Sequence, residues 1–266
     1  MAHLVDLSCP PPAFIRAAAE AGYNAVSLRT LGHPEDHPWD LAHDPRLLAE
    51  TQRALEETGI TWTDAEVVRV TEELDAQAWE PALAVAAELG VRQITANIQS
   101  AEAERCLEPF QALSRLAEKY GQTINVEFVS WAGVSDLRQA KEFLIAAGRP
   151  NVGILVDMLH FYRSRVSLIE LDNCPQDWFH YIHLCDCPKE IPGSVCQLRR
   201  DGLTRRLCPG EGAIPIREIL SHIPGQIPVY VLEIPNRERL ERIGLGLYAR
   251  WLLEKTKAYL TMSDRT

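Results

Sequence analysis

The chain has 266 residues, of which 46% are hydrophobic and 24% charged, a composition typical of a globular protein. Its formal net charge of −10 argues against nucleic acid as the main partner, because binding to phosphate backbones needs a basic surface. No apolar run is long enough to cross a membrane, and the N-terminal "MAHLVDLSCPPP" lacks the charged start and apolar core of a signal peptide. We therefore expect a cytoplasmic protein.

The seven cysteines are odd in number and scattered along the chain. "CDC" at 185–187 has neither the spacing of a redox motif nor a second cysteine pair with which to bind zinc. Reduced thiols in a reducing compartment are the simpler interpretation, and a disulfide framework is not expected.

A helix–glycine–strand unit recurs along the first 160 residues. Each copy has an Ala/Leu/Glu-rich stretch typical of a helix, then a glycine, then a short apolar or β-branched run; the glycines are Gly22, Gly59, Gly90, Gly121 and Gly148. Glycine is the usual left-handed residue after a helix, so the run that follows each one is predicted to be a strand.

Five strands are predicted in this way, near residues 24–29, 61–66, 92–97, 123–128 and 152–157. The runs "HLVDLS", "HYIHLCD" and "IPVYVLEIP" add three more, near residues 3–8, 180–185 and 228–233. Eight βα units in a chain of this length predict a (β/α)8 TIM barrel, one domain over residues 1–266, closed by a helix at about 237–260. A doubly wound open sheet is the alternative, but "LSCPPP" after the first strand offers no glycine-rich phosphate turn. Long loops at 30–43 and 188–212 follow strand ends on the face where barrels place their sites.

Four late strands end in side chains that can bind a metal: Glu127, Asp157, His183 and Glu233. Strand alternation places all four on the inner face, with Val126, Ile154, Ile182 and Leu232 facing the helices. Three carboxylates crowded together would raise one another's pKa unless a cation joined them. We therefore predict one divalent ion, Mn²⁺ first, with Mg²⁺, Co²⁺ or Zn²⁺ as alternatives.

Each of these four residues alone has a simpler interpretation. A strand-end carboxylate commonly caps a helix or pairs with a surface lysine, and a single histidine is commonly structural. Four of them at the same end of successive strands, in matching phase, favour a shared site.

The order Glu127, "DMLHF", "HLCD", "PGEG" and "LEIP" resembles the xylose isomerase-like TIM barrels of the sugar phosphate isomerase/epimerase superfamily. "VDMLHFYRSRVSLIEL" is most similar to the branch of inosose isomerases and 3-dehydroshikimate dehydratases. The resemblance implies that Glu127, Asp157, His183 and Glu233 hold one metal ion. It also implies that His160 contacts the substrate or its metal-bound oxygen.

The same resemblance suggests further substrate-binding residues. Arg206, or its neighbour Arg205, would bind a hydroxyl, carboxylate or phosphate group. Further contributors from strand ends and the following loop would be Arg29, Glu66, Asn97 and Trp131. For each of these a solvated loop residue or a local ion pair is the alternative, and for Arg29 and Glu66 the two interpretations are equally good.

The chemistry implied is removal of a proton next to a metal-bound carbonyl or hydroxyl through an enediolate, with Glu127 and Glu233 as acid and base. The substrate would be a sugar, sugar phosphate or inosose, and the enzyme an isomerase or epimerase. A dehydratase of the dehydroshikimate or inosose type is the alternative. Gly133 in "EFVSWAG" stands near where tagatose-type epimerases carry a further glutamate, which weakens that assignment.

Two other functions are compatible with this fold. An endonuclease IV-like enzyme needs extra histidines, which "TWTDAEV" and "QITANI" lack, and an Asp-x-His, which "RRLCPGEG" lacks. A non-catalytic binding protein is the other, since fold does not guarantee chemistry. We expect a small polyhydroxylated substrate and no nucleic acid or membrane partner, and a homo-oligomer is compatible with the fold.

Overall fold

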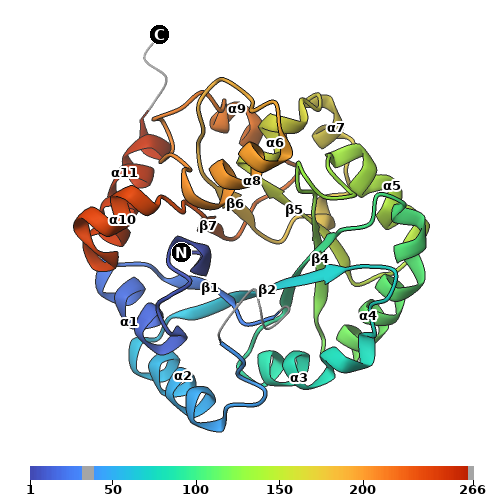
Figure 1. The fold of residues 1–266 in the computed structure, drawn as a ribbon, viewed down its shortest axis with the longest axis horizontal. Coiled ribbons are helices and arrows are strands. Elements are labelled where there is room, and N and C mark those ends of the chain that lie inside the picture. The colour runs from blue at the N-terminus through green and yellow to red at the C-terminus, as the bar shows by residue number, and fades with distance from the viewer. Residues whose placement is uncertain (32–38, 263–266) are drawn as a thin grey trace.

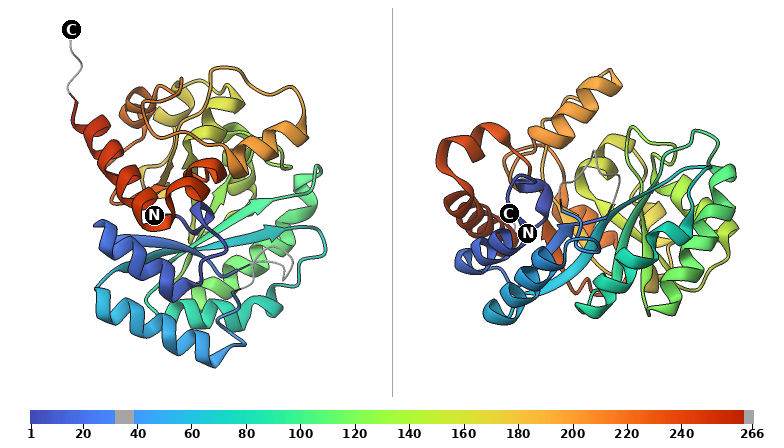
Figure 2. Two further views of the ribbon diagram at one scale, coloured as in Figure 1. Left: turned by 60° about the vertical axis from the view of Figure 1, so that its left-hand side comes forward. Right: turned by 60° about the horizontal axis from the view of Figure 1, so that its bottom comes forward.

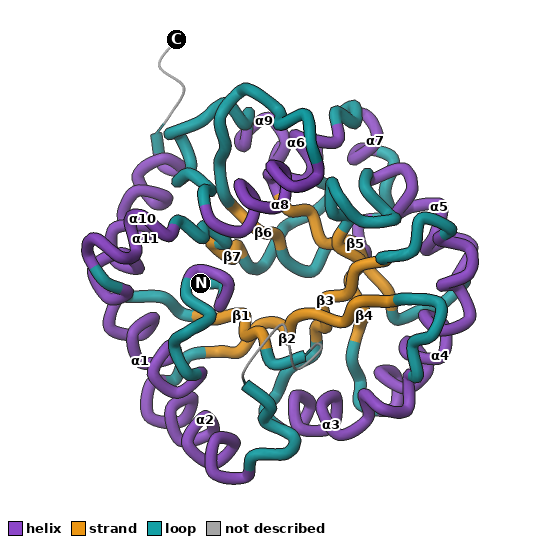
Figure 3. The backbone as a smooth tube through the Cα atoms, in the orientation of Figure 1, coloured by secondary structure: helices purple, strands orange, loops and turns teal. Residues whose placement is uncertain are grey.

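Seven parallel strands form the centre of the protein, and helices surround them (Figure 1). This computed structural model describes residues 1–31 and 39–262. The strands pair in chain order: β1 (Ala25–Arg29), β2 (Thr61–Val70), β3 (Gln93–Ile98), β4 (Thr123–Glu127), β5 (Val152–Asp157), β6 (Ile182–Leu184) and β7 (Tyr230–Leu232). Figure 3 shows the strands as an inner ring. The predicted single-domain TIM barrel fold is present, with its sheet nearly closed.

The outer layer contains helices of very unequal length. The α-helices are α1 (Pro11–Ala21), α2 (Pro45–Thr58), α3 (Glu80–Glu88), α4 (Leu107–Lys119), α5 (Leu137–Ala147), α6 (Met158–Ser164), α7 (Ile169–Asp172), α8 (Val195–Thr204), α9 (Ile216–His222), α10 (Arg237–Ile243) and α11 (Leu245–Thr261). Four 3₁₀ helices join them: η1 (His3–Val5), η2 (Ala76–Trp79), η3 (Ala103–Cys106) and η4 (Gln176–Trp178). None of the helices in the described ranges has the length and apolar character needed to span a membrane.

The predicted first strand, 3–8, is wrong. His3–Val5 form the 3₁₀ helix η1, because the amides of Val5 and Asp6 bond back to Ala2 and His3 instead of to a neighbouring strand. Met1 and Ala2 span the gap: the Ala2 amide donates to the Leu232 carbonyl at 3.0 Å on one side, and the Met1 carbonyl accepts from the Ser27 amide at 3.0 Å on the other. The chain must already turn here, since α1 begins at Pro11.

Two further expectations are corrected in detail. The predicted closing helix 237–260 is divided into α10 and α11 at Gly244, whose φ of 76° breaks the helix. The predicted loop 188–212 contains the helix α8, capped by the Ser194 hydroxyl, which accepts from the Gln197 amide at 3.3 Å. α8, in orange, extends beyond the other helices in the right view of Figure 2. Of the predicted loop 30–43, residues 32–38 lie outside the described residues.

The repeated unit behaves as its sequence predicts. Gly22, Gly59 and Gly148 end α1, α2 and α5 in the left-handed conformation, with φ values of 93°, 67° and 59°. Aspartates begin two of these helices: Asp44 and Asp136 each accept a hydrogen bond from a first-turn amide. Residues that favour the start or the end of a helix flank these helices, which explains why the units could be recognised in the sequence.

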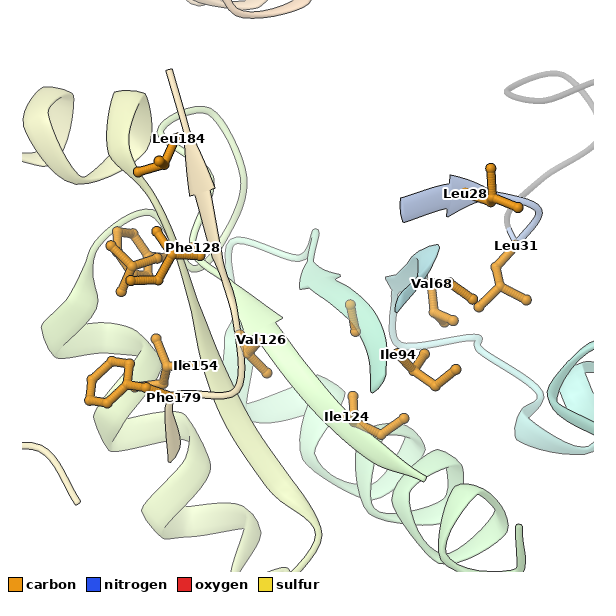
Figure 4. Packing of buried hydrophobic residues seen from close by; sticks show 14 of the residues in the cluster. Leu28, Leu31, Val68, Ile94, Ile124, Val126, Phe128, Ile154, Phe179 and Leu184 are labelled. Atoms are coloured by element: carbon orange, nitrogen blue, oxygen red, sulfur yellow. The ribbon is translucent and has the colours of Figure 1, made fainter. Parts of the chain in front are cut away.

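Two separate apolar layers result from strand alternation. Val126, Ile154 and Leu184 face the helices and belong to the main core (Figure 4), as do Ile182 and Leu232. A small inner cluster of Ala2, Leu155, Tyr181 and Val231 fills the barrel. Since Leu155, Tyr181 and Val231 each lie two residues before Asp157, His183 and Glu233, this inner cluster forms the floor beneath those polar side chains. All seven cysteines are free thiols, as predicted.

Gly153 in β5 provides a test of this packing. A Cβ there would lie 2.5 Å from Asn125 Oδ1 and 2.7 Å from His180 Nδ1, two atoms that are 2.8 Å apart in a mutual hydrogen bond. We expect Gly153→Ala to lower the free energy of unfolding by about 1–3 kcal/mol, because the added methyl overpacks a rigid site. Urea unfolding monitored by circular dichroism measures this.

The matched control is Gly246→Ala in α11, where an added Cβ meets nothing within 4 Å. This variant should be neutral or up to about 1 kcal/mol more stable, since alanine is the better helix former. Equal stability of the two variants would contradict the packing described for β5.

Candidate metal centre

Four polar side chains from successive strands meet at one end of the barrel. Glu127 and Asp157 are the last residues of β4 and β5, His183 is the middle residue of β6, and Glu233 directly follows β7. Asp157 pairs directly with His183 in the strand register. One ligand atom from each of the four lies within 4.8 Å of the others, and all four side chains are buried. The geometry predicted from strand phase is therefore present.

Burial of three carboxylates strongly perturbs their charge states. Desolvation, with repulsion from Glu233 and Asp157, raises the pKa of Glu127 to about 8. Burial would also raise the pKa of Glu233, but the Arg206 guanidinium and His183 hold it well below its usual range. Burial opposes protonation of His183, yet the neighbouring Glu233 and Glu66 carboxylates raise its pKa to about 10. The cluster is thus short of positive charge.

The residues present suit a divalent ion. Both ring nitrogens of His183 are buried and make no hydrogen bond with any described residue, and Nδ1 lies 3.4 Å from Glu233 Oε2. An imidazole with an orphaned nitrogen beside three carboxylate groups is a donor set for a hard or borderline cation. Glu127, Asp157, His183 and Glu233 would hold that ion. This donor set suits Mn²⁺, Mg²⁺, Co²⁺ and Zn²⁺ alike. That the four residues bind a metal stays a prediction.

Arg206, rather than Arg205, faces this cluster. Its Nη1 donates to Asp157 Oδ2 at 2.5 Å, Nη2 lies 2.8 Å from Glu233 Oε2, and Nε donates to the Gly202 carbonyl at 2.7 Å. Arg205 is exposed. Arg206 therefore compensates the charge of two predicted ligands while also lining the cavity beside them.

His160 is fixed by the same turn that ends β5. Its backbone amide donates to Asp157 Oδ1 at 3.0 Å, which caps α6, and the Ser130 amide donates to its Nδ1 at 3.2 Å. Burial lowers the pKa of His160 to about 4, so the ring is neutral, and with Nδ1 accepting, its proton is on Nε2. Trp131 contacts the ring edge-on, at 4.8 Å between centroids. The predicted pair of His160 and Trp131 thus forms one wall of the site.

A cavity of about 120 Å³ opens beside the cluster. Among the residues that line it are the predicted Arg29, Asn97, Trp131, His160 and Arg206. Asn97 accepts a hydrogen bond from Gln99 Nε2 at 2.6 Å. Glu66 lies outside this lining: it pairs with Arg29 Nη2 at 3.2 Å, the local ion pair that was the alternative for both residues.

Two larger surface hollows of about 640 and 670 Å³ border α4, and none of the four predicted ligands lines them.

The sequence interpretation missed three polar residues that line the cavity: Arg69, Gln99 and Arg199. β2 continues to Val70, four residues beyond its predicted end, and Arg69 pairs in register with Asn97. Alternation counted from Glu66 would have missed Arg69, because the strand register shifts between Ala65 and Val68 and changes which residues share a face. Arg199 lies on α8, inside the segment that was expected to be loop.

Comparison with known proteins identifies the family. The sequence profile of the xylose isomerase-like TIM barrel family matches residues 15–255, and the chain belongs to this family. Inosose isomerases are among its relatives: that of Halalkalibacterium halodurans is 27% identical over 118 residues, and that of Bacillus licheniformis 32% over 117. These matches cover 44% and 43% of this chain, and only 40% of either relative's length.

Solved structures with the same fold include enzymes of different kinds. The IolI protein, crystallised with a zinc atom, superposes with a TM-score of 0.78 at 19% identity over 98% of this chain and 99% of that one. The probable 3-DHS dehydratase AsbF of Bacillus anthracis gives 0.74 at 14% identity over 99% and 98%. D-allulose 3-epimerase of Methylomonas sp. gives 0.69 at 17% over 97% and 94%. At these identities the likeness shows the fold.

The predicted metal site is testable by thermal unfolding. Adding Mn²⁺ or Zn²⁺ to the chelator-treated protein should raise its melting temperature, since an ion at 100 times its Kd stabilises the folded state by about 2.7 kcal/mol. Asp157→Asn should abolish this increase because it removes the charge of one ligand. Glu254→Gln, on the exposed face of α11, is the control and should respond like the wild type. A wild-type melting curve that none of the four ions moves would contradict the site.

Proposed function

We propose that this chain is a divalent-metal-dependent isomerase or epimerase of a small polyhydroxylated substrate, such as a sugar, sugar phosphate or inosose. The observation that carries the proposal is the convergence of Glu127, Asp157, His183 and Glu233 within 4.8 Å beside a cavity. The inosose isomerase relatives support this class of reaction, although their matches span about 40% of their length. We propose Mn²⁺ first; the zinc of the IolI structure makes Zn²⁺ the main alternative.

A metal ion held by these residues would polarise a carbonyl or hydroxyl oxygen of the substrate and so acidify the neighbouring C–H. Glu127 and Glu233 lie on different strands at the cavity, so one can remove a proton while the other returns one, through an enediolate. Neutral His160, with its proton on Nε2, can donate a hydrogen bond to a substrate oxygen. Trp131 limits access of water on that side.

This mechanism predicts exchange of a substrate proton with solvent. In D₂O the metal-loaded wild type should incorporate deuterium into its substrate, identified from a panel of ketoses, ketose phosphates and inososes by NMR. Glu127→Gln and Glu233→Gln should each slow exchange by about 10²–10⁴-fold, because a positioned acid or base contributes about that much. Metal content is measured in parallel, and Glu254→Gln is the control.

Exchange at the wild-type rate in metal-loaded Glu127→Gln would show that Glu127 is not the base. Loss of exchange only in samples that have also lost the ion would assign both glutamates to metal binding alone.

A metal-dependent dehydratase is the second candidate, and one observation favours it. Four arginines line the cavity of a chain whose net charge is −10: Arg29, which pairs with Glu66, Arg206, which pairs with Asp157 and Glu233, and Arg69 and Arg199. An exposed arginine at the cavity, such as Arg199, suits a substrate carboxylate. The probable 3-DHS dehydratase AsbF shares the fold. Here the proton removed from carbon would be followed by departure of a neighbouring hydroxyl as water.

Arg199 distinguishes a carboxylate substrate from a neutral one. Arg199→Gln should raise KM up to about fivefold for a cyclic hydroxy-acid, because an ion pair at an exposed position contributes at most about 1 kcal/mol. The KM of a neutral inosose should not change. Arg200→Gln is the matched control: the neighbouring arginine pairs with Asp201 at 3.3 Å and lies outside the cavity. Equal KM values for the acid in both variants would remove the support for the dehydratase.

A further inference from the structure

A second buried polar group lies directly behind the predicted ligands. Glu66, on β2, has one carboxylate oxygen, Oε1, 3.8 Å from His183 Nε2. Its other oxygen, Oε2, is 3.2 Å from Arg29 Nη2 and 3.3 Å from Arg29 Nε. The side chains of Glu66 and His183 are each 1% exposed, and that of Arg29 is 14% exposed. The three side chains form a continuous row from β1 through β2 to β6.

The two nitrogens of His183 face different partners. Nδ1 lies 3.4 Å from Glu233 Oε2, on the side of the predicted ligands, whereas Nε2 lies toward Glu66. Neither nitrogen makes a hydrogen bond with the described residues. An imidazole that binds a metal through one nitrogen carries its proton on the other, and that N–H needs an acceptor in a buried site. Glu66 Oε1 is the acceptor that the structure offers to Nε2.

Glu66 is itself held in place. Besides the two Arg29 contacts, the Ser27 hydroxyl lies against Glu66 Oε1. Arg29 compensates the charge of this buried carboxylate, which explains how it persists in the barrel interior. Both neighbours belong to β1, so the orientation of Glu66 is set by the strand next to its own.

A second metal ion is the competing interpretation, because ligand atoms of Asp64, Glu66 and His183 also lie within 4.8 Å of one another. One argument counts against an ion there in addition to the predicted one. His183 would have to bind one ion through each nitrogen, which requires a fully deprotonated ring. A single ion, with Glu66 on the other side of the histidine, does not require this.

We propose that Glu66, fixed by Arg29, is a positioning residue that accepts the Nε2–H of His183 and so aims Nδ1 at the metal. The inference rests on the proposed metal site and assigns Glu66 and Arg29 to that site's support rather than to substrate contact. It gives the chain a carboxylate–histidine–metal triad contributed by β2 and β6. Such outer carboxylates fix the tautomer and ring orientation and make the histidine a better ligand.

The test is the affinity for the metal alone, with no substrate present. Zn²⁺ and Co²⁺ dissociation constants, from competition with a chelator, should rise by about 10–100-fold in Glu66→Leu, as for other outer carboxylates. Glu66→Gln keeps a carbonyl acceptor and nearly the same shape, so its loss should be smaller, several-fold. The visible absorption of bound Co²⁺ should change in Glu66→Leu at saturating metal, since the histidine is no longer oriented.

The matched control is Glu170→Leu, which removes another ion-paired glutamate, 3.2 Å from Lys141 on the outer layer. Its metal affinity and Co²⁺ spectrum should equal those of the wild type. If Glu66→Leu does not fold, Glu66→Gln carries the test, and an unchanged dissociation constant with an unchanged Co²⁺ spectrum overturns the proposal. A wild type that binds no ion overturns the metal site itself, which is a different result from a wild type that binds and a Glu66 variant that binds equally well.

Discussion

The collection of three carboxylates in a buried pocket is the constraint on which the rest of the site depends. Each buried charge is costly unless a neighbour compensates it. Arg206 pairs with Asp157 and Glu233, and Arg29 pairs with Glu66. Glu127 forms no ion pair with any described residue, and its pKa is raised to about 8. The remaining shortage of positive charge lies where the four predicted ligands meet, so a divalent cation would complete the balance.

The barrel makes this concentration of charge sustainable. Parallel strands bring their ends together, and strand alternation places an apolar residue two positions before each polar one on the same inner face. Leu155, Tyr181 and Val231 thus form a floor beneath the polar side chains. Asp157 belongs to both the site and the fold, because its Oδ1 caps α6 by accepting from the His160 amide. One aspartate therefore fixes its own orientation and that of the histidine three residues later.

The sequence predicted those parts of the fold that local signals determine. Helix-ending glycines located β1 to β5, apolar runs located β6 and β7, and strand phase located the four predicted ligands. It failed where long-range contacts decide: the short run at 3–8 was taken for a strand, but His3–Val5 form η1, and β2 continues to Val70. It also could not place α8, because a polar segment such as 195–204 becomes a helix here through its contacts, among them Trp131 against Gly202.

The division between elements that local signals determine and elements that they do not also separates the residues proposed for the chemistry from those proposed for substrate specificity. The four predicted ligands and His160 sit on strand ends or caps, so they follow from the repeated unit and suit isomerase, epimerase and dehydratase chemistry alike. The residues that we propose to separate these reactions, Arg69 and Arg199, lie on the extension of β2 and on α8, the two elements that the sequence placed least well. In a barrel of this kind, the regular strand ends position the residues proposed for proton transfer. The choice of substrate depends on the irregular segments that surround those strand ends.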